Sequence, residues 1–227
     1  MEQEYTIKRS SSRKKLTITV ERDRSVVVHA PVSTSEARIQ EIVHSKRQWI
    51  YEKMHHPQKY SDLPHPPGKE LVNGESALYL GRHYQIEIVD EGIKSVQFDH
   101  CFRVPALRTA DRRKAMQNWY VERANEQILP RVKKFADSLG VNYSEAKIVG
   151  SLYRWGSCTT RDNVTFNWKL IKAPMFVVDY VIVHELTHLM EPNHTPRFWN
   201  IVRAQSPKAE KAKQWLLEHG QLLEGDI

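Results

Sequence analysis

His184-Glu185-Leu186-Thr187-His188, followed six residues later by His194, is the stretch from which this chain is best understood. On an α-helix, positions i and i+4 project from one face, so the two histidines of the pentapeptide lie side by side. That spacing lets two imidazoles bind one metal ion and leaves Glu185 free to act as a base. A third histidine beyond the helix completes a three-ligand zinc site with one open position for water. The stretch therefore predicts a metal-dependent hydrolase.

The residues around the pentapeptide predict that it lies on a buried helix. The run from Met175 to Met190 is apolar on nearly all sides, which is typical of a helix inside a core. Pro174 suits the first turn of this helix, and Pro192 forces the residue before it away from helical angles and ends the helix. The turn that follows is expected to bring His194 back over the first two histidines.

The charge of the chain is spread evenly along its length. The formal net charge is +7, of which residues 1–108 contribute +3 (17 Lys and Arg against 14 Asp and Glu) and residues 109–227 contribute +4 (17 against 13). No separate basic module for nucleic acid stands out from this distribution. The 227 residues, 40% of them hydrophobic, suffice for one large domain or two small ones.

The lack of a recognisable signal region and the use of cysteine predict a cytoplasmic protein. The first residues contain no apolar signal region, and no stretch approaches the roughly 18 apolar residues of a membrane span. Cys101 and Cys158 form no C-x-x-C pair, which argues against a zinc ribbon and excludes a disulfide scaffold. We expect a cytoplasmic protein with reduced thiols and no membrane partner.

The pattern of elements predicts an α+β fold in two parts. Residues 1–108 are expected to form a β-rich region with a hairpin and one helix that starts near Ser33. A proline-rich linker at 57–70 interrupts this region. Residues 109–227 are expected to begin with a long helix capped by Thr109 and kinked or split at Pro130. A small sheet, the metal-binding helix and C-terminal helices follow.

Short motifs in the second half of the chain resemble those of the YgjP-like metallopeptidase family, which is itself similar to the SprT and WLM zinc peptidases. The first half carries less specific marks, such as Tyr79-Leu80-Gly81. The motifs in the second half are Arg154-Trp155-Gly156-Ser157-Cys158, Asn167, Ala173-Pro174, Asp179-Tyr180-Val181, His184 to Leu189, Asn193-His194 and Phe198-Trp199.

The resemblance implies a zincin-like catalytic domain over residues 109–227, with a long backing helix and a small, mostly antiparallel sheet. It implies one Zn²⁺ ion bound by His184, His188 and His194, with Glu185 as the catalytic base. The expected substrate is a protein or peptide, and the SprT and WLM relatives suggest DNA or DNA-bound proteins as further partners. Glu191 stands where metzincins have a glycine, which counts against membership of that class.

Four more residues are candidates for supporting roles. Asp179, Asn167 and Glu191 are candidates to bind the outer ring nitrogens of the ligand histidines, as polar groups around metal sites normally do. Arg154 is a candidate to stabilise a developing oxyanion or to contact substrate. A solvated charge, a turn residue, or an arginine stacked on Trp155 would account for these residues equally simply.

Three other functions remain open from the sequence. A metal-dependent hydrolase of nucleotide phosphoanhydrides would suit the positive charge, although the chain lacks a G-x-x-x-x-G-K phosphate loop. A DNA-associated module with a secondary metal site would show a steep dependence of DNA binding on salt. A structural metal would require a fourth protein ligand, for which Cys158 is a candidate, although a small buried residue is the more common role of a free cysteine.

Overall fold

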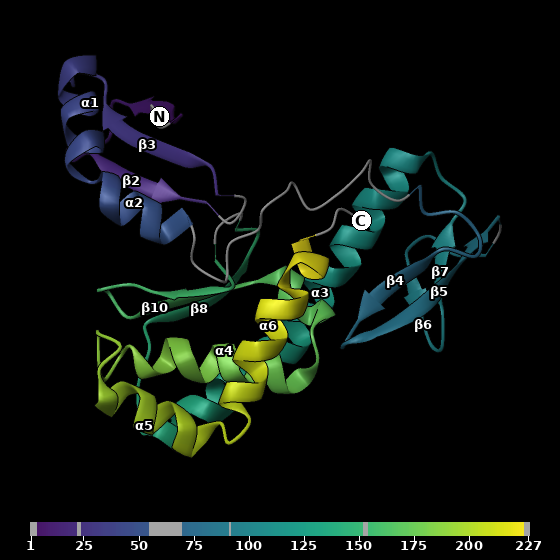
Figure 1. The fold of residues 1–227 in the computed structure, drawn as a ribbon. Coiled ribbons are helices and arrows are strands. Elements are labelled where there is room, and N and C mark those ends of the chain that lie inside the picture. The colour runs from purple at the N-terminus through teal and green to yellow at the C-terminus, as the bar shows by residue number, and fades with distance from the viewer. Residues whose placement is uncertain (1–3, 22–23, 55–69, 91, 152–153, 225–227) are drawn as a thin grey trace. The chain divides into compact units, whose positions relative to one another are not determined.

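In the computed structural model, the chain forms two compact units, Met1–Pro64 and His65–Ile227 (Figure 1). Each unit has an apolar core of its own. The predicted linker lies, apart from Glu70, outside the described residues. The structure describes residues 4–21, 24–54, 70–90, 92–151 and 154–224.

The N-terminal unit is a three-stranded sheet with two helices. Its strand order is β1-β3-β2, with β1 parallel and β2 antiparallel to β3, so the predicted hairpin of β2 and β3 is confirmed. The elements are β1 (Thr6–Ser10), β2 (Thr17–Val20), β3 (Val26–Pro31), α1 (Glu36–Ser45) and α2 (Arg47–Met54).

The single helix predicted for this unit is in fact two helices. The N-cap of α1 is Ser35 rather than Ser33, and its hydroxyl accepts a hydrogen bond from the Arg38 N–H at 3.3 Å. Lys46 has φ −101° and ψ 7°, which interrupts the helical backbone between α1 and α2. Ile50 of α2 still reaches the core, because the second helix starts directly after this break.

The C-terminal unit starts with a four-stranded sheet of order β4-β5-β7-β6. Tyr79 of this sheet and Trp119 of the following helix pack edge to face, with ring centroids 5.0 Å apart, and Phe102 lies 5.0 Å from the same indole. These contacts put the sheet in one core with the helix, so the unit boundary differs from the one predicted after residue 108. The strands are β4 (Ser76–Tyr79), β5 (Arg82–Val89), β6 (Gln97–Phe98) and β7 (Phe102–Pro105).

The long backing helix is α3 (Thr109–Leu139), and it runs through Pro130 without being split. Pro130 is exposed, so water can bind the carbonyl that loses its helical partner there. The N-cap is Arg108, which makes no side-chain capping bond, so Thr109 is not the cap. The helix ends at Leu139, and its C-cap is Gly140, which has a left-handed backbone with φ +68°.

A second sheet, a short 3₁₀ helix and three α-helices follow α3 in the described part of the chain, which confirms the α+β class. The sheet order is β8-β10-β9, with β8 parallel and β9 antiparallel to β10, so this sheet is mixed rather than mostly antiparallel. None of the helices in the described part of the chain is long and apolar enough to cross a membrane. The elements are β8 (Glu145–Val149), β9 (Gly156–Cys158), β10 (Asn163–Asn167), the 3₁₀ helix η1 (Trp168–Lys172), α4 (Met175–Thr187), α5 (Pro196–Gln205) and α6 (Ala209–Glu224).

Helix α4 is the centre of this unit. It packs against α3, against β9 and β10 of the sheet, and against α5 and α6 (Figure 1). Its start is fixed by the turn between β4 and β5, where the Gly81 N–H donates to the Lys172 carbonyl at 2.8 Å. Gly81 has φ +81°, and a Cβ there would lie 2.5 Å from Cγ of Pro174. Only glycine fits this turn against the residue that precedes α4.

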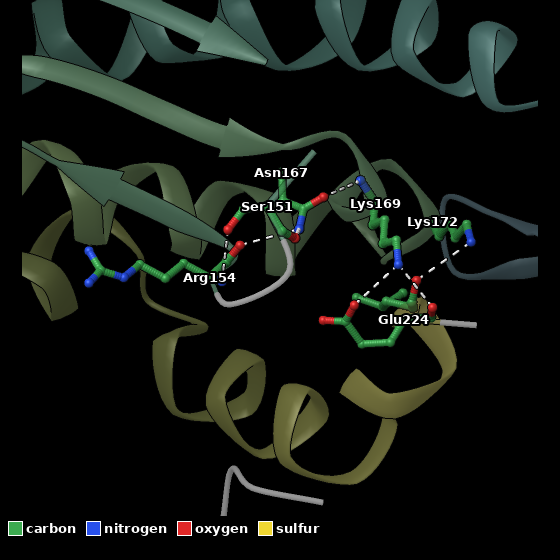
Figure 2. A network of polar contacts seen from close by, with 7 residues as sticks. Ser151, Arg154, Asn167, Lys169, Lys172 and Glu224 are labelled. Carbon is green, nitrogen blue, oxygen red and sulfur yellow. Dashed lines mark hydrogen bonds and ion pairs between the residues drawn. The ribbon is translucent and has the colours of Figure 1, made fainter. Parts of the chain in front are cut away.

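The end of α6 is held by two lysines of η1 (Figure 2). The Lys169 ammonium donates to the backbone carbonyl of Glu224 at 2.9 Å and to its carboxylate at 3.2 Å. Lys172 is buried and donates to the Leu223 carbonyl at 3.5 Å. These cations lie where a helix carries its negative end, so they stabilise the C-terminus of α6 and join it to η1.

Candidate metal centre

Helix α4 presents the first two histidines on one face, as the spacing predicts. The ring centroids of His184 and His188 are 5.1 Å apart. The helix ends at Thr187, earlier than Met190, because the N–H groups of His188 and Leu189 bind carbonyls three residues back instead of four. His188 is therefore the C-cap and keeps an αR backbone, with φ −63° and ψ −19°.

The turn after α4 brings the third histidine to the first two. Nε2 of His194 lies 3.1 Å from Nε2 of His184. One ligand atom from each of His184, His188 and His194 lies within 4.8 Å of the other two. Three imidazole nitrogens are thus gathered at one point, and the predicted juxtaposition of these residues is present in the structure.

The surroundings of His184 and His188 favour neutral imidazoles. Burial lowers the pKa of His184 to about 3, and the charges of His188, His194 and Lys213 act in the same direction. Burial also lowers the pKa of His188. Neutral imidazole is the form that binds metal, so these environments keep the ring nitrogens available at neutral pH.

A backbone carbonyl, and not a side chain, orients the second histidine. Nδ1 of His188 lies 3.3 Å from the Glu191 carbonyl oxygen, a contact in which the ring N–H donates and leaves Nε2 as the acceptor. Nδ1 of His184 is buried and has no hydrogen-bond partner among the described residues. The Glu191 carboxylate is directed elsewhere and lies 3.9 Å from Nε of Arg197.

Asp179 does not contact a ligand histidine in the structure. Its carboxylate accepts a hydrogen bond from Arg131 of α3 at 2.9 Å. Asp179 lies five positions before His184, which places the two side chains about 140° apart around the helix. The carboxylate therefore ties α4 to α3, on a different face from the metal centre.

Glu185 is buried against strand β9. A Cβ at Gly156 would lie 2.6 Å from Cγ and 2.9 Å from Oε1 of Glu185, so the absence of a side chain there makes room for the carboxylate. The backbone N–H of Cys158 donates a hydrogen bond to this carboxylate. Burial raises the pKa of Glu185 to about 7, against the opposing effects of the Arg154 charge and the Cys158 N–H.

Asn167 fixes the segment that leads into β9 (Figure 2). Its side-chain amide donates to the Ser151 carbonyl at 2.7 Å and to the Arg154 carbonyl at 3.2 Å, and its oxygen accepts from the Lys169 N–H at 3.0 Å. Asn167 thus positions the backbone of Arg154 instead of a histidine ring. The Arg154 side chain is exposed and extends away from this network, and its charge acts on Glu185.

Two aromatic residues of α5, Phe198 and Trp199, contact the metal centre, and no such role was predicted for them although they belong to a family motif. The Phe198 ring centroid lies 5.0 Å from that of His184, 4.7 Å from that of His188 and 4.7 Å from that of His194. The Trp199 ring stacks on His194. In a sequence, a Phe-Trp pair at the start of a helix looks the same whether it packs in a core or against ligands.

A second cluster of metal-binding side chains, Asp99-His100-Cys101, differs from the triad in its surroundings. Arg103 binds the Asp99 carboxylate at 2.9 Å, and the N–H groups of His100 and Cys101 donate to it as well. Burial raises the pKa of the Cys101 thiol, which disfavours the thiolate that a metal needs. Among the described residues, the histidine triad is therefore the cluster better suited to a divalent cation.

A helix with two histidines one turn apart, a buried glutamate between them and a third histidine from the next turn defines a candidate centre of metal-dependent hydrolysis. The family model described as "YgjP-like, metallopeptidase domain" matches residues 14–219. The chain belongs to the YgjP-like metallopeptidase family, as its motifs predict.

Two solved structures are similar to part of the chain. The metallopeptidase zymogen jannalysin of Methanocaldococcus jannaschii is 20% identical, over 40% of this chain and 95% of that one, with a TM-score of 0.37. The metallopeptidase zymogen abylysin of Pyrococcus abyssi is 17% identical, over 44% of this chain and all of that one, with a TM-score of 0.38. No curated protein matches the chain.

Proposed function

We propose that the protein is a zinc-dependent peptidase in which His184, His188 and His194 hold one zinc ion and Glu185 is the general base. One observation carries this proposal: three imidazole nitrogens lie within 4.8 Å of one another, and Glu185, the residue after the first histidine, is buried. Membership of a metallopeptidase family supports it.

The residues of the triad fit zinc. Three neutral nitrogen donors and no protein anion form a common ligand set of catalytic zinc sites, which keep one position open. The Glu191 carbonyl leaves Nε2 of His188 free for a metal, which supports the same assignment. When bound, zinc supplies a Lewis acid that polarises a substrate carbonyl and acidifies water.

Glu185 is suited to move the proton in hydrolysis. Its carboxylate takes a proton from the attacking water and delivers it to the amine nitrogen that leaves when the peptide bond breaks. A pKa of about 7, caused by burial, lets the same group accept and release a proton near neutral pH. The Cys158 N–H and the space over Gly156 hold the carboxylate in place.

Strand β9 is suited to bind an extended peptide. It lies at the edge of its sheet, and Trp155 and Thr159 use their backbone groups to bind β10. Backbone groups alternate in direction along a strand, so those of Gly156 and Cys158 point away from β10. Because the Cys158 N–H binds the Glu185 carboxylate, the groups proposed to pair with a substrate are those of Gly156 and the Cys158 carbonyl. A substrate strand that pairs with this edge would pass beside Glu185.

Arg154 is proposed to contact the substrate. Its guanidinium is exposed, makes no ion pair within the described part of the chain, and is carried on a backbone that Asn167 fixes. A cation held there can bind the oxygen that becomes negative during hydrolysis, or an acidic group of the substrate.

The test combines metal analysis with hydrolysis of a fluorogenic casein and a peptide library. We expect wild-type protein to bind one zinc per chain and to cleave peptide, and a chelator to abolish cleavage until zinc is restored. Glu185→Gln should keep the zinc and lose at least about 100-fold in kcat, because a general base contributes that much or more. Glu122→Gln, which changes an exposed carboxylate on α3, is the matched control.

Two outcomes would overturn the proposal in different ways. Peptide cleavage by Glu185→Gln at the wild-type rate would remove Glu185 from its role. Hydrolysis of nucleoside triphosphates instead of peptides, with the same dependence on zinc and Glu185, would keep the metal centre and replace the substrate class.

A further inference from the structure

The third ligand is held differently from the first two. His184 lies on α4 and His188 at its C-cap, whereas His194 lies in the turn between α4 and α5 and is exposed. An exposed side chain on a turn loses conformational freedom when it binds a metal. Any group that fixes the His194 ring beforehand therefore raises the affinity of the site for metal.

The indole of Trp199 lies against this ring. The ring centroids of His194 and Trp199 are 5.5 Å apart, and the ring planes differ by only 20°, so the two rings are stacked. Phe198 meets His194 at nearly a right angle, 84°, from the same helix. Stacking on one ring and edge contact with another restrict the rotation of the imidazole about both of its side-chain torsions.

Trp199 is itself held by helix α6. Nζ of Lys213 lies 4.8 Å from the centroid of the indole, within the range of a cation–π contact. The same ammonium binds the Glu210 carboxylate at 3.2 Å. The indole thus joins a side chain of α6 to the turn that carries His194, and its position does not depend on α5 alone.

We propose that Trp199 is a positioning residue of the metal centre, which holds the His194 imidazole where Nε2 meets the other two ligands and thereby sets the affinity for a divalent cation. This inference rests on the proposed function, because it requires the triad to bind a metal. Removal of the indole is expected to weaken zinc binding on the order of tenfold, as loss of an aromatic stack or of a group that orients a ligand does.

The chain offers a matched control. Trp215 of α6 stacks on His219, with ring centroids 5.0 Å apart and planes 14° apart, and His219 is not part of the triad. Trp199→Leu and Trp215→Leu therefore each remove one tryptophan–histidine stack, and only the first stack involves a proposed ligand. Trp199→Phe keeps an aromatic ring at the site and is the conservative variant.

The experiment measures the zinc dissociation constant of the full-length apo-protein by competition with a chromophoric chelator. We expect about tenfold weaker binding for Trp199→Leu, less than about a twofold change for Trp215→Leu, and recovery of most of the affinity in Trp199→Phe. Thermal unfolding of each apo-protein, followed by circular dichroism, checks that the variants are folded before zinc is added.

A double-mutant cycle distinguishes the positioning of His194 from a general loss of order in α5. In a His194→Ala background, with a weaker chelator, Trp199→Leu should weaken zinc binding by much less than tenfold, because the stack on His194 is gone and only the tilted contact with His184, with ring centroids 5.9 Å apart, remains. Equal weakening in both backgrounds would overturn the inference, and so would equal affinities of Trp199→Leu and wild-type protein. Failure of wild-type protein to bind zinc would instead overturn the proposed function.

Discussion

Gly156→Ala is the substitution that most directly tests the contact between β9 and Glu185. The added Cβ would lie 2.6 Å from Cγ of Glu185, which is 0.8 Å closer than the 3.4 Å at which ordinary contact begins. The Glu185 side chain or the β9 backbone must therefore move by about 1 Å. A displacement of that size at a reacting group costs about 100-fold in rate, or about 2.7 kcal/mol in activation free energy.

The assay is the kcat for a fluorogenic peptide at saturating zinc, with the metal content of each protein measured in parallel. Gly156→Ala should bind zinc like wild-type protein and lose about 100-fold in kcat. Gly150→Ala is the control, because a Cβ there would meet Trp168 at an ordinary 3.5 Å. If Gly156→Ala binds zinc and retains the wild-type kcat, the tight approach of β9 does not position Glu185.

Three further predictions concern stability and the surroundings of the metal centre. Zinc at about 1,000 times its dissociation constant should raise the free energy of unfolding by about 4 kcal/mol, and identical urea midpoints with and without zinc would contradict this. Asn167→Ala should lower the free energy of unfolding by about 1–3 kcal/mol, because the Ser151 carbonyl loses the Asn167 amide as its donor. Asn142→Ala, at an exposed site, is the control and should change the free energy of unfolding little. Asp179→Asn should leave zinc affinity within about twofold of wild type, because the carboxylate pairs with Arg131; a tenfold loss would assign Asp179 to the metal centre.

The metal centre is more predictable from sequence than its surroundings. The i, i+4 spacing and the turn at Pro192 suffice to place three histidines together, because both are local properties of the backbone. Helical periodicity also implies that Asp179 faces away from His184, and the separation of about 140° is the reason it meets α3. Local rules of this kind predict which side chains share a face.

Contacts between distant segments were beyond the reach of such rules. Gly156 looks like an ordinary strand or turn glycine until β9 is seen packed on Glu185. Trp199 has the spacing of a core residue, and only the position of α5 after the turn brings it to His194. The boundary between the two units also depends on a contact between distant segments. The packing of Tyr79 on Trp119 joins the strands before α3 to the helix itself.

The end of α4 has an electrostatic consequence for the ion at this site. Peptide dipoles in a helix add up to about half a negative charge at the C-terminus, and α4 ends at Thr187, next to His188. A divalent cation held by the histidines therefore lies near the attractive pole of the most buried helix of the unit. The same three side chains at the start of a helix would place the cation near the positive end of the helix dipole, which repels it. The direction in which α4 runs therefore favours cation binding.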